Sequence, residues 1–219
     1  MVKFKKTKSA INDLLQVMAA LRSPQGCPWD REQDHMSLRF HAVEEVYELI
    51  DAIESGDDTE LSEELGDLLL QVIFHCQLAK ERGAFDFEKV AREMTEKLLR
   101  RHPHVFGDSN AKTVDAVWAQ WEQIKKAEKK GTHRERTSAL DGIPKHLPAL
   151  MRAEKLIKKA RKAKLLKELK SPAKSQKQLA EELYRLTEYS QSKGWSAEEL
   201  LCRELKKRET NWRKAETQM

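Results

Sequence analysis

The chain of 219 residues is poor in the residues that mark β-rich or disulfide-stabilised folds, with 8 glycines, 6 prolines and 3 cysteines. All-β and collagen-like classes need many turn glycines, so the low glycine content disfavours them. Cys27, Cys76 and Cys202 are odd in number, widely spaced and form no CxxC pair. This disfavours a disulfide framework or a zinc ribbon. A reducing compartment fits this cysteine usage, and we expect a cytoplasmic location.

The sequence also lacks long apolar runs and strictly alternating segments. No run approaches the roughly 18 apolar residues that a membrane span needs, and the N-terminal segment has no signal-peptide core. We therefore expect no membrane partner. Apolar residues recur with helical spacing nearly everywhere. The pattern predicts an all-α fold, with helices near 9–22, 38–54, 60–81, 86–101, 114–129, 148–169, 176–191 and 196–215.

Charge is distributed unevenly along the chain. Residues 1–145 hold 22 Lys/Arg and 26 Asp/Glu, whereas residues 146–219 hold 19 and 10. Two glycines and two prolines within 130–148 indicate a linker. We expect a domain at 1–130, a linker at 131–148 and a basic helical region at 149–219. The lysine-rich stretch 152–177 fits a surface for nucleic acid or an acidic partner, or simply a solvated helix, and it lacks interleaved aromatic residues for base stacking.

An acidic segment is the most informative feature of the sequence. No Lys or Arg occurs between Arg39 and Lys80, and residues 41–68 contain eleven Asp or Glu. Side chains three residues apart on a helix are neighbours, so Glu45 and Glu48 share one stripe, and Glu64 and Asp67 share another. The short connection at 55–59 predicts antiparallel helices. With a rise of about 1.5 Å per residue, the four carboxylates come to nearly one level.

A metal ion is the natural partner of these carboxylates. The second helix is apolar nearly all round, which predicts burial, and Glu64 lies within about 40° of Leu68 around the helix. No Lys or Arg within a helical turn can pair with Glu64, and a buried carboxylate without a cation is costly. An all-oxygen ligand set suits Mg²⁺ or Mn²⁺. The alternatives are solvated carboxylates and a di-iron bundle, for which Glu32-x-x-His35 has the spacing.

Cationic and aromatic side chains that a phosphorylated substrate would need follow the acidic segment. Carboxylate-held Mg²⁺ typically meets substrate phosphates, which also bind cationic side chains. Lys97 and Arg101 are four residues apart on one helical face. Trp29 and Trp121 could stack on a nucleobase, and Lys125 follows Trp121 by one turn. Surface exposure and core packing are the alternatives for these residues. The sequence contains no glycine-rich phosphate loop.

Four segments form a distinctive set, namely Gly26-Cys27-Pro28-Trp29-Asp30, Glu44-Glu45-x-x-Glu48, Glu64-x-x-Asp67 and Arg100-Arg101-His102-Pro103-His104-Val105-Phe106. Together they resemble the MazG family of nucleoside triphosphate pyrophosphohydrolases, over about residues 10–153. The resemblance implies a MazG-like helical bundle that oligomerises, usually as a dimer. It also implies Mg²⁺-dependent hydrolysis of NTP or dNTP to the monophosphate and pyrophosphate, by water attack at the α-phosphorus.

The resemblance assigns roles by position. It implies that the metal ligands, which form the catalytic centre, are Glu45, Glu48, Glu64 and Asp67. It implies that Lys97 and Arg101 contact phosphates and that Trp121 and Lys125 line the nucleotide site. Trp29 near the base is a further expectation from its place just before the acidic helix.

The C-terminal region is similar to a shortened second copy of the same domain. Leu179-Ala180-Glu181-Glu182-Leu183 is similar to Leu61-Ser62-Glu63-Glu64-Leu65, but Arg185 stands where Asp67 stands in the first copy. The first acidic helix has no counterpart, so we expect residues 149–219 to be catalytically inactive. Two other functions remain open: a non-catalytic nucleotide-sensing or regulatory protein, and a helical protein that binds nucleic acid through its basic C-terminal region.

Overall fold

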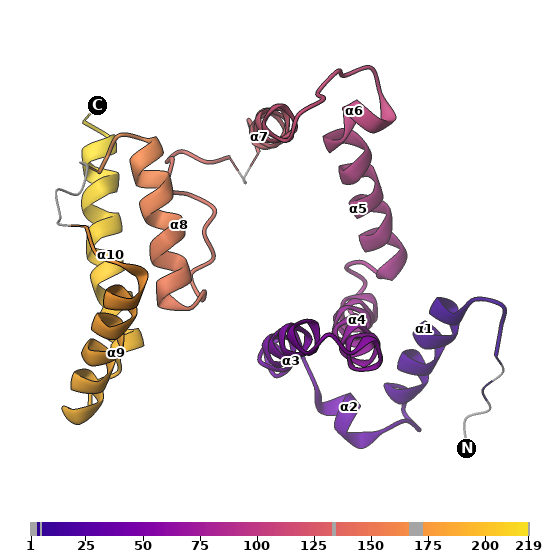
Figure 1. Cartoon of the computed structure of the whole chain (residues 1–219). Coiled ribbons are helices and arrows are strands. Elements are labelled where there is room, and N and C mark those ends of the chain that lie inside the picture. Colours follow the sequence, from indigo (N-terminus) through magenta and orange to yellow (C-terminus); the bar gives the residue numbers. More distant parts are fainter. Residues whose placement is uncertain (1–3, 5, 133–134, 167–172, 219) are drawn as a thin grey trace. The chain divides into compact units, whose positions relative to one another are not determined.

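The computed structural model describes residues 4, 6–132, 135–166 and 173–218, and every regular element in these ranges is a helix (Figure 1). The prediction of an all-α fold is confirmed. None of the described helices combines the length and apolarity needed to cross a membrane. The helices are α1 (Ala10–Leu21), α2 (Pro28–Glu32), α3 (His41–Ser55), α4 (Asp58–Glu81), α5 (Phe87–Arg101), α6 (Pro103–Phe106), α7 (Val114–Lys129), α8 (Ala149–Lys162), α9 (Gln176–Ser192) and α10 (Ala197–Glu216).

The eight predicted helices correspond to α1, α3, α4, α5, α7, α8, α9 and α10. The pattern missed α2 and α6, because helices of 5 and 4 residues are too short to show a helical period. The predicted helix at 148–169 ends earlier, at Lys162. Residues 167–169 of that prediction, 167–172 of the lysine-rich stretch and 133–134 of the predicted linker lie outside the described residues.

The chain forms two compact units, residues 1–121 and 122–219, and the division falls within α7. The predicted linker begins after α7 ends. Part of that linker belongs structurally to the second unit, because Leu140 is 1% exposed within its core. The domain limits at 1–130, 131–148 and 149–219 stay a prediction.

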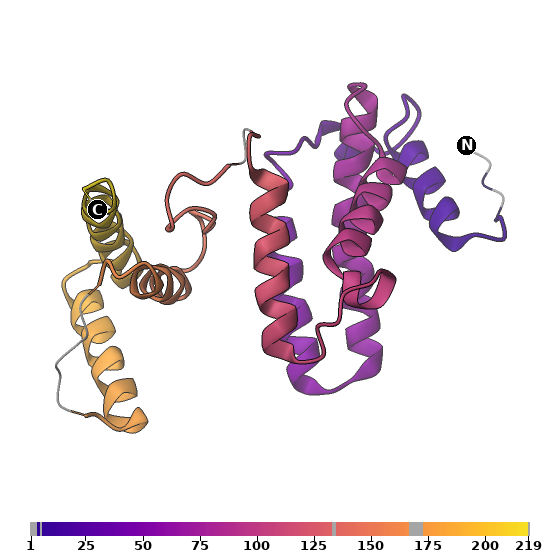
Figure 2. The ribbon, with the colours of Figure 1, turned by 90° about the horizontal axis from the view of Figure 1, so that it is seen from above.

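Local signals in the sequence set the helix ends around the acidic segment. Gly56 ends α3 with φ of 72°, a left-handed conformation that glycine adopts without strain. The Asp57 carboxylate then begins α4 by accepting hydrogen bonds from the amides of Thr59 and Glu60. Asp86 begins α5 in the same way, with Lys89 as donor. The two-residue connection between α3 and α4 therefore produces the predicted antiparallel hairpin (Figure 2).

The core of the first unit lies between α1 and the C-terminal half of α4. Its buried residues come from α1, α4 and the segment before α3, and they are Met18, Leu38, Ile73, Phe74 and Leu78. The turn from α1 into α2 is tight, because the amide of Cys27 donates to the carbonyl of Leu21 at 2.7 Å. A Cβ at Gly26 would lie 2.0 Å from that carbonyl oxygen, so the turn requires glycine.

The prediction that α4 is buried nearly all round, made from its apolar sequence, is wrong. Leu65 is 51% exposed and Val72 is 40% exposed. The first buried residue of α4 is Gln71 and the last is Ala79, and exposed or half-buried residues lie between them. The physical reason is that α3, α1 and α5 are the neighbours packed against α4, and they leave part of its circumference uncovered. Apolar surface is therefore exposed on the hairpin that carries the acidic residues.

The second unit has its own core, built mainly from α8 and α10. Ala149, Ala153, Leu156 and Ala160 of α8 pack with Leu140 and Leu205. Arg152 is 7% exposed and pairs with Glu209 at 2.5 Å. The α9 helix lies largely outside this core, since Ser190 is its one buried residue. The hydrophobic cores of the two units are thus separate sets of residues.

The Arg22 side chain ties the α1–α2 turn to α4. Its guanidinium donates two parallel hydrogen bonds to the Glu81 carboxylate, at 2.8 and 2.7 Å. It also donates to the backbone carbonyls of Asp30 and Gln33 and lies over the Phe74 ring. The Arg22 side chain is 9% exposed. One buried cation therefore holds three segments of the first unit together.

We predict that Arg22→Met lowers the free energy of unfolding by about 1.5–3 kcal/mol, the range for hydrogen bonds to charged groups. Urea denaturation measures the change. The matched control is Arg92→Met, because Arg92 forms an exposed pair with Glu88 one turn away on the same helix. We expect that control to cost at most about 0.5 kcal/mol. Equal losses in the two variants would contradict the assigned role of Arg22.

Candidate functional site

Three carboxylates meet across the hairpin of α3 and α4. Glu45 and Glu48 come from α3, and Glu64 comes from α4. One oxygen from each lies within 4.8 Å of the others, a spacing that would let the three hold one metal ion. Among the described residues, these three form the group of acidic, histidine and cysteine side chains with such spacing. We call Glu45, Glu48 and Glu64 the carboxylate cluster.

The cluster is electrostatically strained. The pKa of Glu64 is raised by desolvation first and then by the neighbouring charges of Glu48 and Asp67. The pKa of Glu48 is raised by desolvation and by Glu45. Their principal electrostatic neighbours are thus carboxylates, which disfavour ionisation of one another. The arrangement favours either proton uptake or the arrival of a cation.

The donor chemistry of the cluster fits a hard divalent cation. One oxygen of Glu64 is buried and accepts no hydrogen bond from the described residues. A buried carboxylate oxygen without a partner is rare and calls for an explanation such as an ion. Carboxylate oxygens are the ligands that Mg²⁺ and Mn²⁺ prefer. The structure therefore contains a candidate acidic metal site.

Asp67, the fourth predicted ligand, lies one turn after Glu64 on α4 and is half-buried. Its charge acts on both Glu48 and Glu64. The close group of three does not include it. Asp67 therefore borders the cluster, and its role as a ligand stays a prediction.

The histidine of the Glu32-x-x-His35 pattern lies against another histidine. The Nδ1 atoms of His35 and His75 are 2.8 Å apart, and the two rings are stacked. Burial and the His35 charge lower the pKa of His75. The described residues around this pair do not form a metal-binding group. The structure thus gives no support to a di-iron arrangement at this position.

Gln71 is a polar contact of the cluster that the sequence analysis did not single out. Its side-chain amide nitrogen donates to the carboxylate of Glu45 at 3.1 Å. Gln71 is 8% exposed, although it is a polar residue. In the sequence, Gln71 is distinguished only as the one polar residue within the apolar run Leu68–Phe74. Its contact with Glu45 cannot be predicted without knowing which residue of α3 lies opposite.

A cavity of about 240 Å³ adjoins the cluster at Glu45. Residues from α1, α2, α3, α4 and the segment before α3 line it, namely Met18, Leu21, Trp29, Asp30, Leu38, His41, Glu45, Leu70, Gln71 and Phe74. Trp29 is 52% exposed and meets the His41 ring edge-on at 6.2 Å. The structure thus brings the predicted Trp29 to the same cavity as Glu45.

The remaining predicted substrate residues lie on α5 and α7. Lys97 and Arg101 are half-buried on α5. Trp121 lies in an aromatic group with Trp118 and His102, at ring-centre distances of 6.2 and 5.1 Å. Lys125, one turn further along α7, pairs with Glu122 at 2.7 Å. The roles of these four residues in substrate binding stay predictions.

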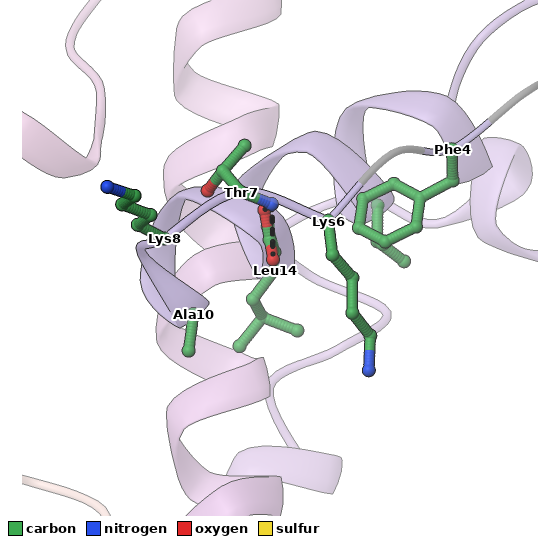
Figure 3. A pocket seen from close by; sticks show the side chains of 8 residues that line it. Phe4, Lys6, Thr7, Lys8, Ala10 and Leu14 are labelled. Atoms are coloured by element: carbon green, nitrogen blue, oxygen red, sulfur yellow. Dashed lines mark hydrogen bonds between the residues drawn. The ribbon is translucent and has the colours of Figure 1, made fainter.

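A larger hollow lies beside the start of α1 (Figure 3), and its lining includes no residue of the carboxylate cluster. Phe4, Lys6, Thr7 and Leu14 are among its lining residues. Its one carboxylate, Asp13, accepts two hydrogen bonds from the amide of Thr7. One carboxylate that already accepts hydrogen bonds does not suffice to hold a metal ion. We therefore assign the candidate metal site to the carboxylate cluster.

The fold and the site define an all-helical protein with a carboxylate-rich candidate metal site between two antiparallel helices. Residues 33–106 match the MazG nucleotide pyrophosphohydrolase domain. Through this domain the chain belongs to the MazG family. The matched range contains the whole carboxylate cluster, Asp67, Lys97 and Arg101.

Several curated proteins are similar to the chain. A protein of Escherichia coli (strain K12) named nucleoside triphosphate pyrophosphohydrolase is 49% identical over 150 residues, which is 68% of this chain and 56% of that protein. The nucleoside triphosphate pyrophosphohydrolase/pyrophosphatase MazG of Thermotoga maritima is 46% identical over 176 residues, with coverage of 80% and 66%. The chain thus spans little more than half the length of the Escherichia coli relative.

A MazG-related protein from Thermotoga maritima with a known crystal structure is 25% identical to this chain, with a TM-score of 0.45. The match covers 52% of this chain and 98% of that one.

The raised pKa of Glu64 yields a prediction about stability without metal. Between the ordinary value of 4.5 and the raised pKa of the folded state, the folded protein retains a proton that the unfolded chain has released. The resulting stabilisation is present below that value and is lost as pH rises through the folded pKa. In EDTA, Glu64→Gln should therefore lose less thermal stability than the wild type between pH 5 and pH 8.

The control for this prediction is Glu54→Gln, which removes the same charge from an exposed position on α3. Thermal unfolding followed by circular dichroism at both pH values measures the effect. We expect the control to follow the wild type. A Glu64→Gln profile parallel to that of the wild type would show that Glu64 titrates normally.

Proposed function

We propose that the protein hydrolyses nucleoside triphosphates, NTP or dNTP, to the monophosphate and pyrophosphate in a Mg²⁺-dependent reaction. The observation that carries the proposal is the carboxylate cluster with its unpartnered Glu64 oxygen, inside a MazG domain. The names of the relatives point to the same activity. Water attacks the α-phosphorus, the bond from that phosphorus to the bridging oxygen breaks, and pyrophosphate leaves.

The proposed ligands are Glu45, Glu48, Glu64 and Asp67. When bound, Mg²⁺, or Mn²⁺ in its place, would neutralise phosphate charge and polarise a phosphoryl oxygen. Glu45 is oriented by the hydrogen bond from Gln71. Glu64 presents its free oxygen from the other helix. The carboxylates of the two helices thus lie close together without a ligand, and this preorganisation reduces the side-chain rearrangement that metal binding requires.

The phosphates need cationic groups in addition to the metal. We assign Lys97 and Arg101 to this role, because they lie one turn apart on α5 within the matched domain. Lys125 and Trp121 of α7 and Trp29 of α2 are assigned to the nucleotide by their place in the sequence. Planar guanidinium groups such as that of Arg101 suit bidentate recognition of phosphate.

Product analysis tests the proposal. The full chain is incubated with a panel of NTPs and dNTPs and Mg²⁺, and monophosphate, diphosphate, pyrophosphate and phosphate are resolved. We expect monophosphate and pyrophosphate, with no turnover in EDTA. Glu64→Gln should reduce the rate by more than the roughly 10–100-fold typical when a residue that hydrogen-bonds to a metal ligand is replaced.

Glu54→Gln serves again as the charge-matched control and should retain wild-type turnover. Diphosphate and phosphate as products would mean attack at the γ-phosphorus and would contradict the mechanism. Binding of nucleotide and Mg²⁺ without turnover would favour a nucleotide-sensing or regulatory protein instead. Affinity for RNA that falls steeply with salt, with no nucleotide turnover, would favour the nucleic-acid-binding alternative.

We further propose that the protein is a homodimer through the outer face of α3. Val43, Val46, Ile50 and Ile53 follow one another at intervals of 3, 4 and 3 residues and are 42–59% exposed. This spacing is typical of helices that pair along an apolar seam. Leu65 and Val72 of α4 add exposed apolar surface to the same hairpin. A second copy presents an identical seam, so pairing would remove both from water.

We predict that Ile50→Asp converts the dimer to a monomer, because pairing would bury the new charge in an apolar seam. Light scattering after size-exclusion chromatography should change from about twice the 25.4 kDa chain mass to that mass. Val114→Asp is the matched control, since Val114 is 73% exposed at the start of α7. A wild-type protein that is itself monomeric, or an unchanged mass in Ile50→Asp, would contradict the proposal.

A further inference from the structure

The cavity beside the carboxylate cluster has the size of a subsite for one planar ring. Its volume of about 240 Å³ is below the range of roughly 300–1,000 Å³ that suits drug-sized ligands. Apolar side chains from α1 and α4 form much of its lining, including Met18, Leu70 and Phe74. Glu45 belongs both to this lining and to the cluster. A ligand with phosphates at the cluster could therefore place another group in the cavity.

Gln71 gives the cavity a defined polar group. A carboxylate only accepts hydrogen bonds when ionised, so the contact with Glu45 fixes the nitrogen of the Gln71 amide toward that residue. The carbonyl oxygen of the same amide is then turned away from Glu45. That oxygen is buried and has no hydrogen-bond partner among the described residues. A ligand N–H group would satisfy it.

The other polar groups around the cavity are mostly acceptors too. Asp30 and Glu45 contribute carboxylates to the lining, and a carboxylate offers no donor when ionised. The His41 ring nitrogen Nδ1 already faces Glu44 at 3.6 Å. A ligand ring whose edge carries an amino group therefore suits the cavity. A ring edge on which two carbonyl oxygens flank a single N–H suits it less, because those oxygens would face other acceptors.

Trp29 supplies a face on which a planar ring can stack. It lies on α2 beside the cavity, is 52% exposed, and keeps its ring edge-on to His41. Stacking of bases on aromatic side chains is favourable for every base, because each has a π-face. Stacking on Trp29 would therefore provide affinity, and the Gln71 oxygen would provide discrimination.

We propose that the cavity between Trp29, His41 and Gln71 is the nucleobase subsite, and that the Gln71 carbonyl oxygen accepts a hydrogen bond from an amino group of the base. Gln71 is then a specificity-determining residue that favours adenine, cytosine and guanine over uracil and thymine. The inference rests on the proposed function, because it takes the base to be part of a nucleotide whose phosphates bind at the carboxylate cluster. Through Glu45, the same amide also links the base to the proposed metal ligands.

The test uses binding of nucleoside monophosphates in EDTA, so that neither metal nor turnover contributes. The chain has five tryptophans, and their indole N–H groups give separate signals in a ¹⁵N NMR spectrum. Titration with CMP should shift the Trp29 signal, which is assigned by its absence in Trp29→Phe. We expect UMP to bind about three- to tenfold more weakly than CMP, the effect of one net hydrogen bond.

Gln71→Met should reduce this preference for CMP to less than about twofold. The matched control is Gln77→Met, because Gln77 also lies on α4 and donates to a carboxylate, that of Glu81. We expect that control to keep the wild-type preference. Trp29→Ala, at an exposed position, should weaken CMP and UMP alike, and it tests the cavity should Gln71→Met fail to fold.

Three outcomes would overturn the proposal: shifts of the Trp118 or Trp121 signals with Trp29 unchanged, an undiminished preference for CMP in Gln71→Met, or no tryptophan shift at millimolar nucleotide. Hydrolysis is measured separately on the wild type. Binding at Trp29 without pyrophosphate release would support the proposed subsite and contradict the proposed hydrolysis. Pyrophosphate release with the base bound at Trp121 would support the hydrolysis and contradict the subsite.

Discussion

The close approach of three carboxylates across the α3–α4 hairpin is the constraint on which the first unit depends. Desolvation and the neighbouring charges raise the pKa of both Glu48 and Glu64, so the hairpin holds together against this repulsion. The opposing contribution comes from the other half of α4, where Ile73, Phe74 and Leu78 are buried against α1. The helix thus divides into a half that stabilises the unit and a half that bears the charge.

This division also explains the positions of the supporting contacts. Arg22 pairs with Glu81 near the C-terminal end of α4 and also contacts α2, the helix that carries Trp29. Gln71 lies where the buried half begins and reaches Glu45 across the hairpin. The proposed metal ligands therefore lie next to a rigid core without being part of it. Such placement keeps the cluster accessible to a charged ligand and limits its reorganisation.

The exposed apolar surface of the hairpin and its acidic surface arise from the same helices. The α3 helix turns Glu45 and Glu48 toward the cluster and leaves Val46, Ile50 and Ile53 exposed. A monomer seldom leaves a continuous apolar patch of this kind in water. The dimer proposed here would cover it with a second copy, and α3 would then serve both the interface and the site.

Local spacing allowed much of the fold and part of the site to be predicted. Glu45 and Glu48, one turn apart, were predicted to approach Glu64 because a short turn joins their helices, and the structure brings these three together. Asp86 and Gly56 marked helix ends through their own side-chain and backbone chemistry. The burial of all of α4 was predicted wrongly, because an apolar sequence does not indicate whether the surface that covers it belongs to the same chain.

The sequence by itself determined the helices, their caps and the two acidic stripes, since each depends on residues within about four positions of one another. Only the tertiary structure decided that Gln71 reaches Glu45, that Trp29 meets His41 at the same cavity, and that Arg22 joins α1 to Glu81. These contacts depend on the rotation and register of helices that are distant in sequence. Side-chain packing in the shared core sets that register, and no local pattern encodes it.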